Sequence, residues 1–440
     1  MYENEFCECT FSNLLEKKFT GLLSFGESKD GKLIIKSKEA ISEFSFLSKN
    51  NLEYIYGRTS NGKLFTIINP FNSSSTIDSE ARYTFIFSDI IIGKAINNIK
   101  DLEIKKVEFK LNGIDFWIRN SGFELKNDTI KTFDLEYKIP ESINIFKNDE
   151  LEIDVNYNIN RNFNASPKTI TFNEYKTFSI SFIKPVTITK AKSIIFRFCA
   201  LINLVTYMFD QPNEIRIAED GKFNMTLFDL NKNQIKIKGG VYNFLLNFSK
   251  FQLISQVTIS NWLTNYSRDE HIIQILLSFF NNNGINQIGS FLEICKGLES
   301  FNATYHNQPI RSASEFKHLK ESIKEKLDFE EYSLIENSLI FANNPNLYVR
   351  LKILYDIYNG KLFTKLGLSY DFFDLIKNTR NYYTHFSKKN KIIPLNNLHH
   401  TSIKGHFALT FMYLCILGFE KEDLESSMLS YFDSNFYFVV

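Results

Sequence analysis

The segment Arg380-Asn381-Tyr382-Tyr383-Thr384-His385 is the most informative stretch of this 440-residue chain. It places a permanent cation, an amide and a titratable imidazole within one short run. At about 100° of rotation per residue, residues 370–386 predict an amphipathic helix, which Ser369 or Asp371 would cap. The face expected to dock carries Phe372, Leu375, Ile376, Thr379, Tyr383 and Phe386. The opposite face, expected to stay free, carries Lys377, Arg380, Asn381, Thr384 and His385.

The region around this segment is locally basic, although the whole chain has a net charge of only +1. No Asp or Glu occurs from Leu375 to Phe419. A positive surface of this kind indicates a polyanionic partner. The bases there are Lys377, Arg380, Lys388, Lys389, Lys391 and Lys404.

The spacing of Arg and His is not specific by itself. Arg311 and His318 offer a similar spacing elsewhere in the chain. The adjacent Asn381, the amphipathic helix and the acid-free surroundings distinguish the pair Arg380 and His385. An Arg and a His on an ordinary solvated helix face are the plain alternative.

Residues 378–386 resemble the HEPN signature, in its fullest form Arg-Asn-x-x-x-His. Residues 291–301 resemble an early helix of the Apea-like HEPN group, and the looser resemblance covers about residues 284–432. It implies a homodimeric RNA endonuclease of bacterial anti-phage defence by abortive infection, with structured RNA such as tRNA as its substrate. A β-rich N-terminal region is usual in that group. A bundle that binds RNA or a partner protein without cutting is the alternative.

Cutting RNA through its own 2′-hydroxyl needs a base, an acid and positive charge at the phosphorane. An imidazole suits the base or the acid, so His385 is the candidate for both. Arg380 suits the phosphate, because a guanidinium donates two parallel hydrogen bonds. Asn381 is expected to orient the imidazole or to bind a phosphate oxygen. Because one chain offers one such His, an acid and a base together predict two chains.

Other residues near the motif are candidates for RNA contact. Tyr382 could stack on an unpaired base, with packing as the alternative, and Thr384 could touch a phosphate. Lysines would hold the RNA backbone without reading its sequence. Glu299 could support the Arg380 guanidinium across the bundle, with a solvated Glu as the alternative. The predicted RNA-binding set is Lys377, Tyr382, Thr384, Lys388, Lys389 and Lys391.

We expect no metal and no cofactor. His399, His400 and His406 have no carboxylate or Cys close in sequence. The five Cys form an odd set without a CxxC pair, which disfavours a disulfide framework or a zinc ribbon and favours a reducing cytoplasm. The first residues are acidic where a signal peptide is basic, and the longest apolar run, residues 407–419, is too short to span a bilayer.

The organisation is predicted as α+β and multidomain. Residues 1–245 are expected to form an antiparallel β-rich sandwich or barrel, with one helix at about residues 190–208, and to act as a sensing domain for a phage-derived trigger or partner. Residues 246–283 are expected to form a helical connector, and residues 284–440 an all-α HEPN bundle. Four turn dipeptides mark the β region: Asp30-Gly31, Asn61-Gly62, Asn112-Gly113 and Asp220-Gly221. Helical periodicity marks residues 242–256, 271–280, 287–301, 314–327, 331–342, 347–358, 370–386 and 398–418.

Overall fold

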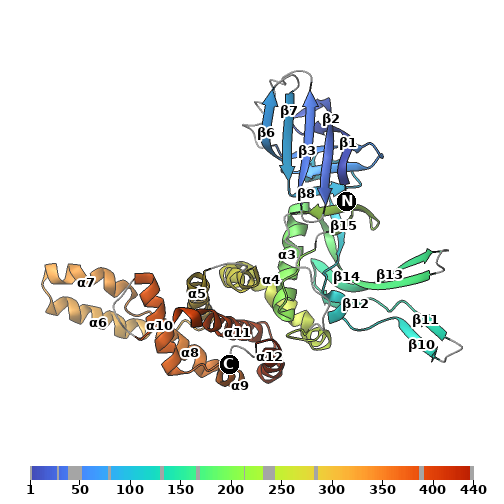
Figure 1. Cartoon of the computed structure of the whole chain (residues 1–440). Coiled ribbons are helices and arrows are strands. Elements are labelled where there is room, and N and C mark those ends of the chain that lie inside the picture. Colours follow the sequence, from blue (N-terminus) through green and yellow to red (C-terminus); the bar gives the residue numbers. More distant parts are fainter. Residues whose placement is uncertain are drawn as a thin grey trace. The chain divides into compact units, whose positions relative to one another are not determined.

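The computed structural model describes residues 2–26, 29–37, 52–77, 81–128, 133–164, 169–212, 214–230, 243–281, 286–385 and 391–436. The chain divides into a β-rich unit and a helical unit (Figure 1). The β-rich unit holds residues 1–199, 210–242 and 247–256. The helical unit holds residues 200–209, 243–246 and 257–440. The order of a β-rich part followed by a helical bundle is confirmed, while the domain limits at residues 245 and 283 stay a prediction.

Within the described ranges, fourteen strands form one antiparallel sheet, in the order β12-β13-β14-β9-β15-β16-β8-β5-β4-β1-β2-β3-β7-β6. A separate hairpin contains β10 and β11. The bounds are β1 (Tyr2–Phe11), β2 (Leu14–Gly26), β3 (Lys29–Ser37), β4 (Tyr54–Thr59), β5 (Leu64–Ile68), β6 (Phe71–Ile77), β7 (Ala81–Phe87), β8 (Asp89–Ile92), β9 (Ile104–Phe109), β10 (Phe123–Asp128), β11 (Phe133–Tyr137), β12 (Ile143–Lys147), β13 (Leu151–Asn164), β14 (Thr169–Val186), β15 (Glu214–Ala218) and β16 (Phe223–Asp229).

The turn dipeptides explain part of this topology. Asn61-Gly62 joins β4 to β5 and Asp220-Gly221 joins β15 to β16, and both glycines have the positive φ that such turns need. Asp30-Gly31 was predicted as a turn, and this is wrong, because it lies inside β3. Gly31 packs closely there, since a Cβ would lie 2.0 Å from the ring of Phe87 on β7 and that ring would have to move for any larger residue.

The β-rich core lies where the sheet curls. Phe11 on β1 and Phe85 on β7 have ring centroids 5.3 Å apart, and both belong to one buried cluster. The predicted sandwich or barrel is therefore a single curled sheet. Elsewhere, helix α3 (Ile188–Thr206) covers the sheet, and Phe198 packs 4.9 Å from Phe178 of β14. This helix confirms the helical interruption predicted at about residues 190–208.

The helical unit follows most of the predicted segments. One continuous helix, α4, stands where two separate helices were predicted, and its first residues, up to Gln256, belong to the β-rich unit. Helices α9 and α12 were not predicted. The bounds are α4 (Phe248–Ser278), α5 (Gln287–Tyr305), α6 (Ala313–Lys326), α7 (Phe329–Phe341), α8 (Leu347–Tyr358), α9 (Lys361–Lys365), α10 (Tyr370–His385), α11 (Leu398–Ile416) and α12 (Lys421–Asn435), while a short α2 (Ile114–Trp117) belongs to the β-rich unit. No helix in the described ranges is long and apolar enough to cross a membrane.

The apolar helix α11 is the centre of the helical unit, with nearly every side chain from Thr401 to Leu414 buried. Two glycines let α5 approach it closely. A Cβ on Gly405 would lie 2.5 Å from Ile294, and one on Gly297 would lie 2.8 Å from Leu409. Helix α10 packs on α5 and α8. The close α5–α11 pair therefore supports the helix that carries the Arg-Asn-x-x-x-His motif.

Candidate active site

Helix α10 presents the motif, and its docking face is rotated from the predicted one. Its buried residues are Phe373, Ile376 and Thr379, whereas Phe372 and Tyr383 are only half-buried. The prediction included Phe372 in the docking face and left Phe373 out, but the buried residues follow one another at three-residue steps that begin at Phe373. As predicted, Ser369 caps the helix, since its hydroxyl accepts a hydrogen bond from the Phe372 amide at 3.3 Å.

A buried hydroxyl fixes the chain that follows the helix. Thr379 donates its hydroxyl to the Leu375 carbonyl at 2.6 Å and accepts the Ile393 amide at 2.9 Å. The segment that includes Ile393 is therefore held against α10, which keeps the exposed Lys391 in the vicinity of the motif helix.

Two partners fix the Arg380 guanidinium. Its Nη2 lies 3.5 Å from Oε2 of Glu299 on α5, and its Nη1 donates to Oδ1 of Asn381 at 3.3 Å. Arg380 and Glu299 are each about 30% exposed, so the pair borders solvent. The ion pair expected between these two residues is thus present. A guanidinium held on one side by a carboxylate keeps further N–H groups for a phosphate.

Asn381 and Thr384 already have partners within α10. The Asn381 amide oxygen accepts from Arg380, and the Thr384 hydroxyl donates to the Arg380 carbonyl at 2.7 Å. Their expected contacts with the imidazole or with phosphate stay predictions. The structure groups Asn381 with Arg380, which favours a role in orienting the guanidinium.

His385 is exposed at the last position of α10. It follows Arg380 by five positions, which is about 7.5 Å along a helix axis. This separation is on the scale of one phosphodiester group and its ribose. Lys388 and Lys389, predicted as RNA contacts, lie outside the described residues.

The acid-free run in the sequence is not acid-free in space. Lys377 donates to Oδ1 of Asp374 at 2.6 Å and lies 5.5 Å over the ring of Tyr348. The Lys377 ammonium lowers the pKa of the Asp374 carboxyl. Glu299 pairs with Arg380 in the same way. Two cations of α10 therefore have carboxylate partners from outside residues 375–419. Sequence reasoning missed Asp374 because the acid-free window began one residue after it.

Tyr382 and Tyr383 form an edge-to-face pair with ring centroids 5.1 Å apart. Both rings are half-buried. Tyr382 therefore keeps an accessible part, and its stacking on a base stays a prediction. Tyr383 contributes less to the core than the predicted docking face required.

Of the three histidines weighed as metal ligands, His406 is a core residue. It is fully buried, stacks on Phe279, and has hydrogen-bond partners in the Leu276 carbonyl at 2.9 Å and the Tyr207 hydroxyl at 2.6 Å. Because the carbonyl can only accept, Nε2 carries the proton and Nδ1 accepts from Tyr207. Burial lowers the pKa of His406 to about 4. In the described parts of the chain, no three His, Cys, Asp or Glu side chains are grouped as metal ligands.

A buried carboxylate links three helices of the bundle. Asp269 on α4 is fully buried and accepts hydrogen bonds from the Tyr305 hydroxyl, from the Tyr413 hydroxyl at 3.1 Å and from Arg268 Nε at 2.8 Å. The network joins α4, α5 and α11. Sequence reasoning missed it because Arg268-Asp269 reads as a solvated pair of charges.

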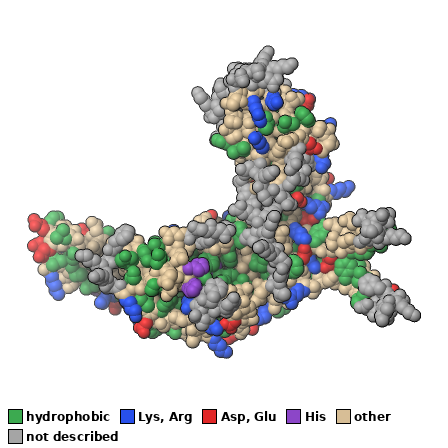
Figure 2. Space-filling view, viewed as in Figure 1, with side chains coloured by type: hydrophobic (Ala, Val, Ile, Leu, Met, Phe, Trp, Pro, Cys, Tyr) green, Lys and Arg blue, Asp and Glu red, His purple; other side chains and the backbone are tan. Residues whose placement is uncertain are grey.

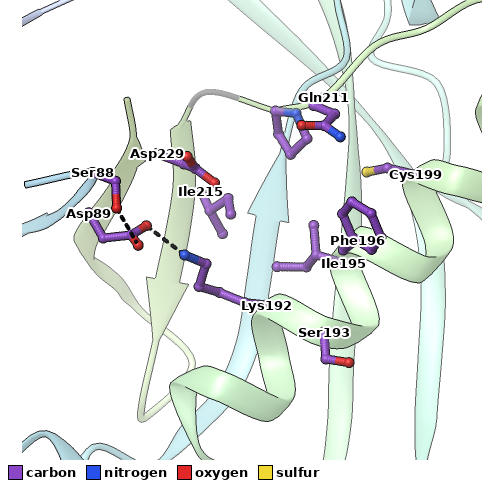
Figure 3. Close-up of a pocket in the computed structure, with 11 residues that line it drawn as sticks. Ser88, Asp89, Lys192, Ser193, Ile195, Phe196, Cys199, Gln211, Ile215 and Asp229 are labelled. Carbon is purple, nitrogen blue, oxygen red and sulfur yellow. Dashed lines mark hydrogen bonds and ion pairs between the residues drawn. The ribbon is translucent and has the colours of Figure 1, made fainter. Parts of the chain in front are cut away.

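The β-rich unit has a cavity of its own, of about 510 Å³. In Figure 3, Lys192 of α3 points toward Asp89, and its Nζ donates to Oδ1 at 2.5 Å. Asp89 on β8 lies directly opposite Asp229 on β16, so Lys192 offsets the repulsion between like charges on neighbouring strands. Phe196 and Ile215 give the cavity an apolar wall. Its size and mixed lining suit a small ligand.

A curled β-rich unit followed by a helical bundle, with Arg380, Asn381 and His385 on an exposed helix, defines a HEPN protein with an N-terminal β domain. Residues 10–262 match the family described as ApeA N-terminal domain 1, and residues 292–423 match the Apea-like HEPN domain. The first match covers more than half of the chain, which therefore belongs to this ApeA family and carries an Apea-like HEPN domain. The predicted resemblance is confirmed. No curated protein and no solved structure matches the chain significantly.

Proposed function

We propose that the protein is a metal-independent endoribonuclease that cuts RNA by attack of the substrate's own 2′-hydroxyl. The observation that carries the proposal is the Arg380 guanidinium, held by Glu299 at the edge of solvent, with an exposed His385 on the same helix. The HEPN domain type is generally associated with nucleases, which supports the same conclusion.

In the proposed reaction, one imidazole takes the proton of the 2′-hydroxyl, and the 2′-oxygen forms a bond to phosphorus. The bond from phosphorus to the 5′-oxygen breaks, and a second imidazole gives that oxygen a proton. Arg380 donates hydrogen bonds to the charged phosphorane oxygens. Asn381 keeps the guanidinium oriented through the hydrogen bond at 3.3 Å. The products carry a 2′,3′-cyclic phosphate and a 5′-hydroxyl.

The two imidazoles are proposed to be His385 of two chains in a homodimer. HEPN domains commonly dimerise and bind RNA, which supports this arrangement. Lysines and Tyr382 would hold the RNA strand, and the proposed set is Lys377, Tyr382, Thr384, Lys388, Lys389 and Lys391.

The proposed biological role is anti-phage defence in the bacterial cytoplasm by abortive infection, with tRNA as a candidate substrate. The β-rich unit would receive a phage-derived trigger or partner. The cavity bounded by Lys192 and Asp89 supports a ligand-binding role for that unit.

The test is incubation of the purified full-length protein with total RNA in EDTA, followed by chemical mapping of the cut ends. We expect cutting that His385→Ala abolishes. The matched control is His318→Ala on α6, which removes the histidine of the similarly spaced pair Arg311 and His318. Cutting by the His385→Ala protein at the wild-type rate would contradict the proposal.

A second candidate function is a HEPN module that binds RNA or a protein without cutting. The carboxylate partners of Lys377 and Arg380 favour its protein-binding form, because they reduce the positive charge offered to a phosphate. Retained RNA binding together with lost cutting in His385→Ala supports the nuclease. Binding without any cutting by the wild-type protein supports the module.

A further inference from the structure

The hairpin of α6 and α7 is an unpartnered part of the helical unit. Figure 1 shows the two helices leaving the bundle side by side, and Figure 2 shows hydrophobic side chains on their surface beside acidic and basic ones. Helix α6 has no buried residue, and no described side chain of α7 is buried. On α7, Phe329 is 88% exposed, Leu334 81% and Ile340 63%. A helix with apolar side chains on several sides normally packs against more than one neighbour.

The hairpin is well defined, so its exposed face is a fixed surface. Asn343 joins the two ends of the hairpin. Its side chain accepts a hydrogen bond from the Arg311 amide at 2.8 Å and donates one to the Arg311 carbonyl at 2.9 Å. Capping boxes start both helices, at Ser312 and at Asp328. The Lys324 ammonium of α6 lies 5.7 Å over the Tyr332 ring of α7, which joins the two helices along their seam.

One side of the hairpin combines an apolar stripe with opposite charges. At about 100° per residue, Phe329, Glu336 and Ile340 fall within about 40° of one another on α7. Lysines at positions 317, 320 and 324 form a stripe on α6, at the i, i+3 and i+7 spacing of a single helix face. The apolar half-buried residues of the seam are Phe316 and Ile323 on α6 and Tyr332, Ile335 and Leu339 on α7. Each stripe lies about a quarter-turn in the same sense from these residues, and Lys320, at the edge of its stripe, is itself half-buried. Because the helices are antiparallel and right-handed, both stripes face the same side.

This side of the hairpin is complementary to itself. If a two-fold axis parallel to the hairpin relates two copies, α6 of each copy packs against α7 of the other. Glu336, in the middle of α7, is then level with Lys320, in the middle of α6 of the second copy. An interface around a two-fold axis needs a patch of this self-complementary kind.

We infer that a second copy of this chain covers the hairpin face formed by Phe329, Glu336, Ile340 and the α6 lysines, and that the two hairpins form a four-helix bundle. The inference deepens the proposed homodimer by naming the surface that holds it. RNA is a poor occupant, because α7 has three Glu and no Lys or Arg, and these would repel phosphates.

The test measures the mass of the full-length protein by light scattering. The wild type should have a mass near twice the 51.4 kDa of one chain. Phe329→Lys and Ile340→Lys should each give the mass of one chain, because they remove apolar contact and face the lysines of the other copy. The matched control is Leu334→Lys, because Leu334 lies on the other side of α7 and should leave the dimer intact. Circular dichroism checks that the variants remain helical.

A charge exchange identifies the occupant as a second copy. Lys317→Glu with Lys320→Glu in one protein, and Glu336→Lys in another, should each weaken self-association at least tenfold. Mixing the two proteins should restore a dimer, because the mixed pair again joins opposite charges. A monomeric wild type, dissociation by Leu334→Lys to the same degree, or no recovery on mixing would overturn the inference. The mass does not depend on RNA cutting, so a dimer without nuclease activity contradicts only the proposed function.

Discussion

The carboxylate of Glu299 on α5 lies 3.5 Å from the guanidinium of Arg380 on α10. This pair ties the motif helix to the helix that packs most closely on α11. Both side chains are about 30% exposed, so solvent weakens the ion pair. The ion pair therefore serves to orient the Arg380 guanidinium and adds little to the stability of the fold.

Glu299→Gln should lower the rate of RNA cutting by about tenfold to a hundredfold, because a misplaced guanidinium loses contact with the phosphorane. The thermal midpoint should change little. The matched control is Asp374→Asn, which breaks the ion pair between Asp374 and Lys377 on α10. This change should affect the affinity for RNA more than the rate of cutting. Single-turnover kinetics separates the two effects. Equal loss of rate in both variants would argue against a positioning role for Glu299.

Arg380→Ala should abolish cutting and leave the fold intact, because the side chain lies at the edge of solvent. Ile376→Ala, one turn earlier on the buried face, should destabilise the protein by about 2–5 kcal/mol. Denaturant unfolding with a cutting assay distinguishes the two. A large loss of stability in Arg380→Ala would assign this residue a structural role.

The choice of nucleophile predicts the behaviour of modified substrates. An RNA with a single 2′-deoxy sugar at the cut site should resist the enzyme, while binding with similar affinity. The rate on normal RNA should follow a bell-shaped pH profile if one histidine is the base and its counterpart the acid. Cutting of the 2′-deoxy substrate, or strict dependence on added Mg²⁺, would contradict the mechanism.

The buried, neutral His406 is expected to make the folded protein less stable in acid. Burial lowers its pKa to about 4 in the folded protein, against about 6.5 for an unperturbed imidazole. Between these values the unfolded chain binds a proton that the folded chain does not, so stability is full above about pH 6.5 and falls toward pH 4. The loss from this group is about 3 kcal/mol. His406→Gln keeps a donor for Leu276 and an acceptor for Tyr207, so its stability should depend less on pH. An unchanged pH dependence in denaturant titrations would show that other groups cause it.

Gly405→Val should destabilise the helical unit, because even a Cβ at this position lies 2.5 Å from Ile294. The expected loss is about 1–3 kcal/mol, or more if α5 and α11 separate. The control is Gly221→Ala, at an open turn where a Cβ meets nothing within 4 Å but the backbone φ is +90°. Its smaller cost would reflect backbone strain alone. A mild effect of Gly405→Val would mean that α5 can shift without loss.

The sequence by itself determined the order of a β-rich region and a helical bundle, most helix limits and the motif residues. Alternation of side chains in β13, the helical period of α10 and the linear spacing of Arg380 and His385 are local properties, and a sequence displays them directly. The boundaries of α8 agree with the prediction for the same reason.

Only the tertiary structure decided which residues surround the motif. The carboxylates of Glu299 and Asp374, the buried Asp269 network and the core role of His406 depend on packing between helices that are far apart in the chain. The docking face of α10 is rotated so that Phe373 is buried in place of Phe372, while Ile376 and Thr379 are buried as predicted, because adjacent Phe372 and Phe373 are equally apolar and only the neighbouring helices select one of them. Gly31 likewise reads as a turn signal, yet it lies inside β3, where the ring of Phe87 on a neighbouring strand occupies the space of a Cβ. Contacts of this kind are set by shape in three dimensions, which no local pattern encodes.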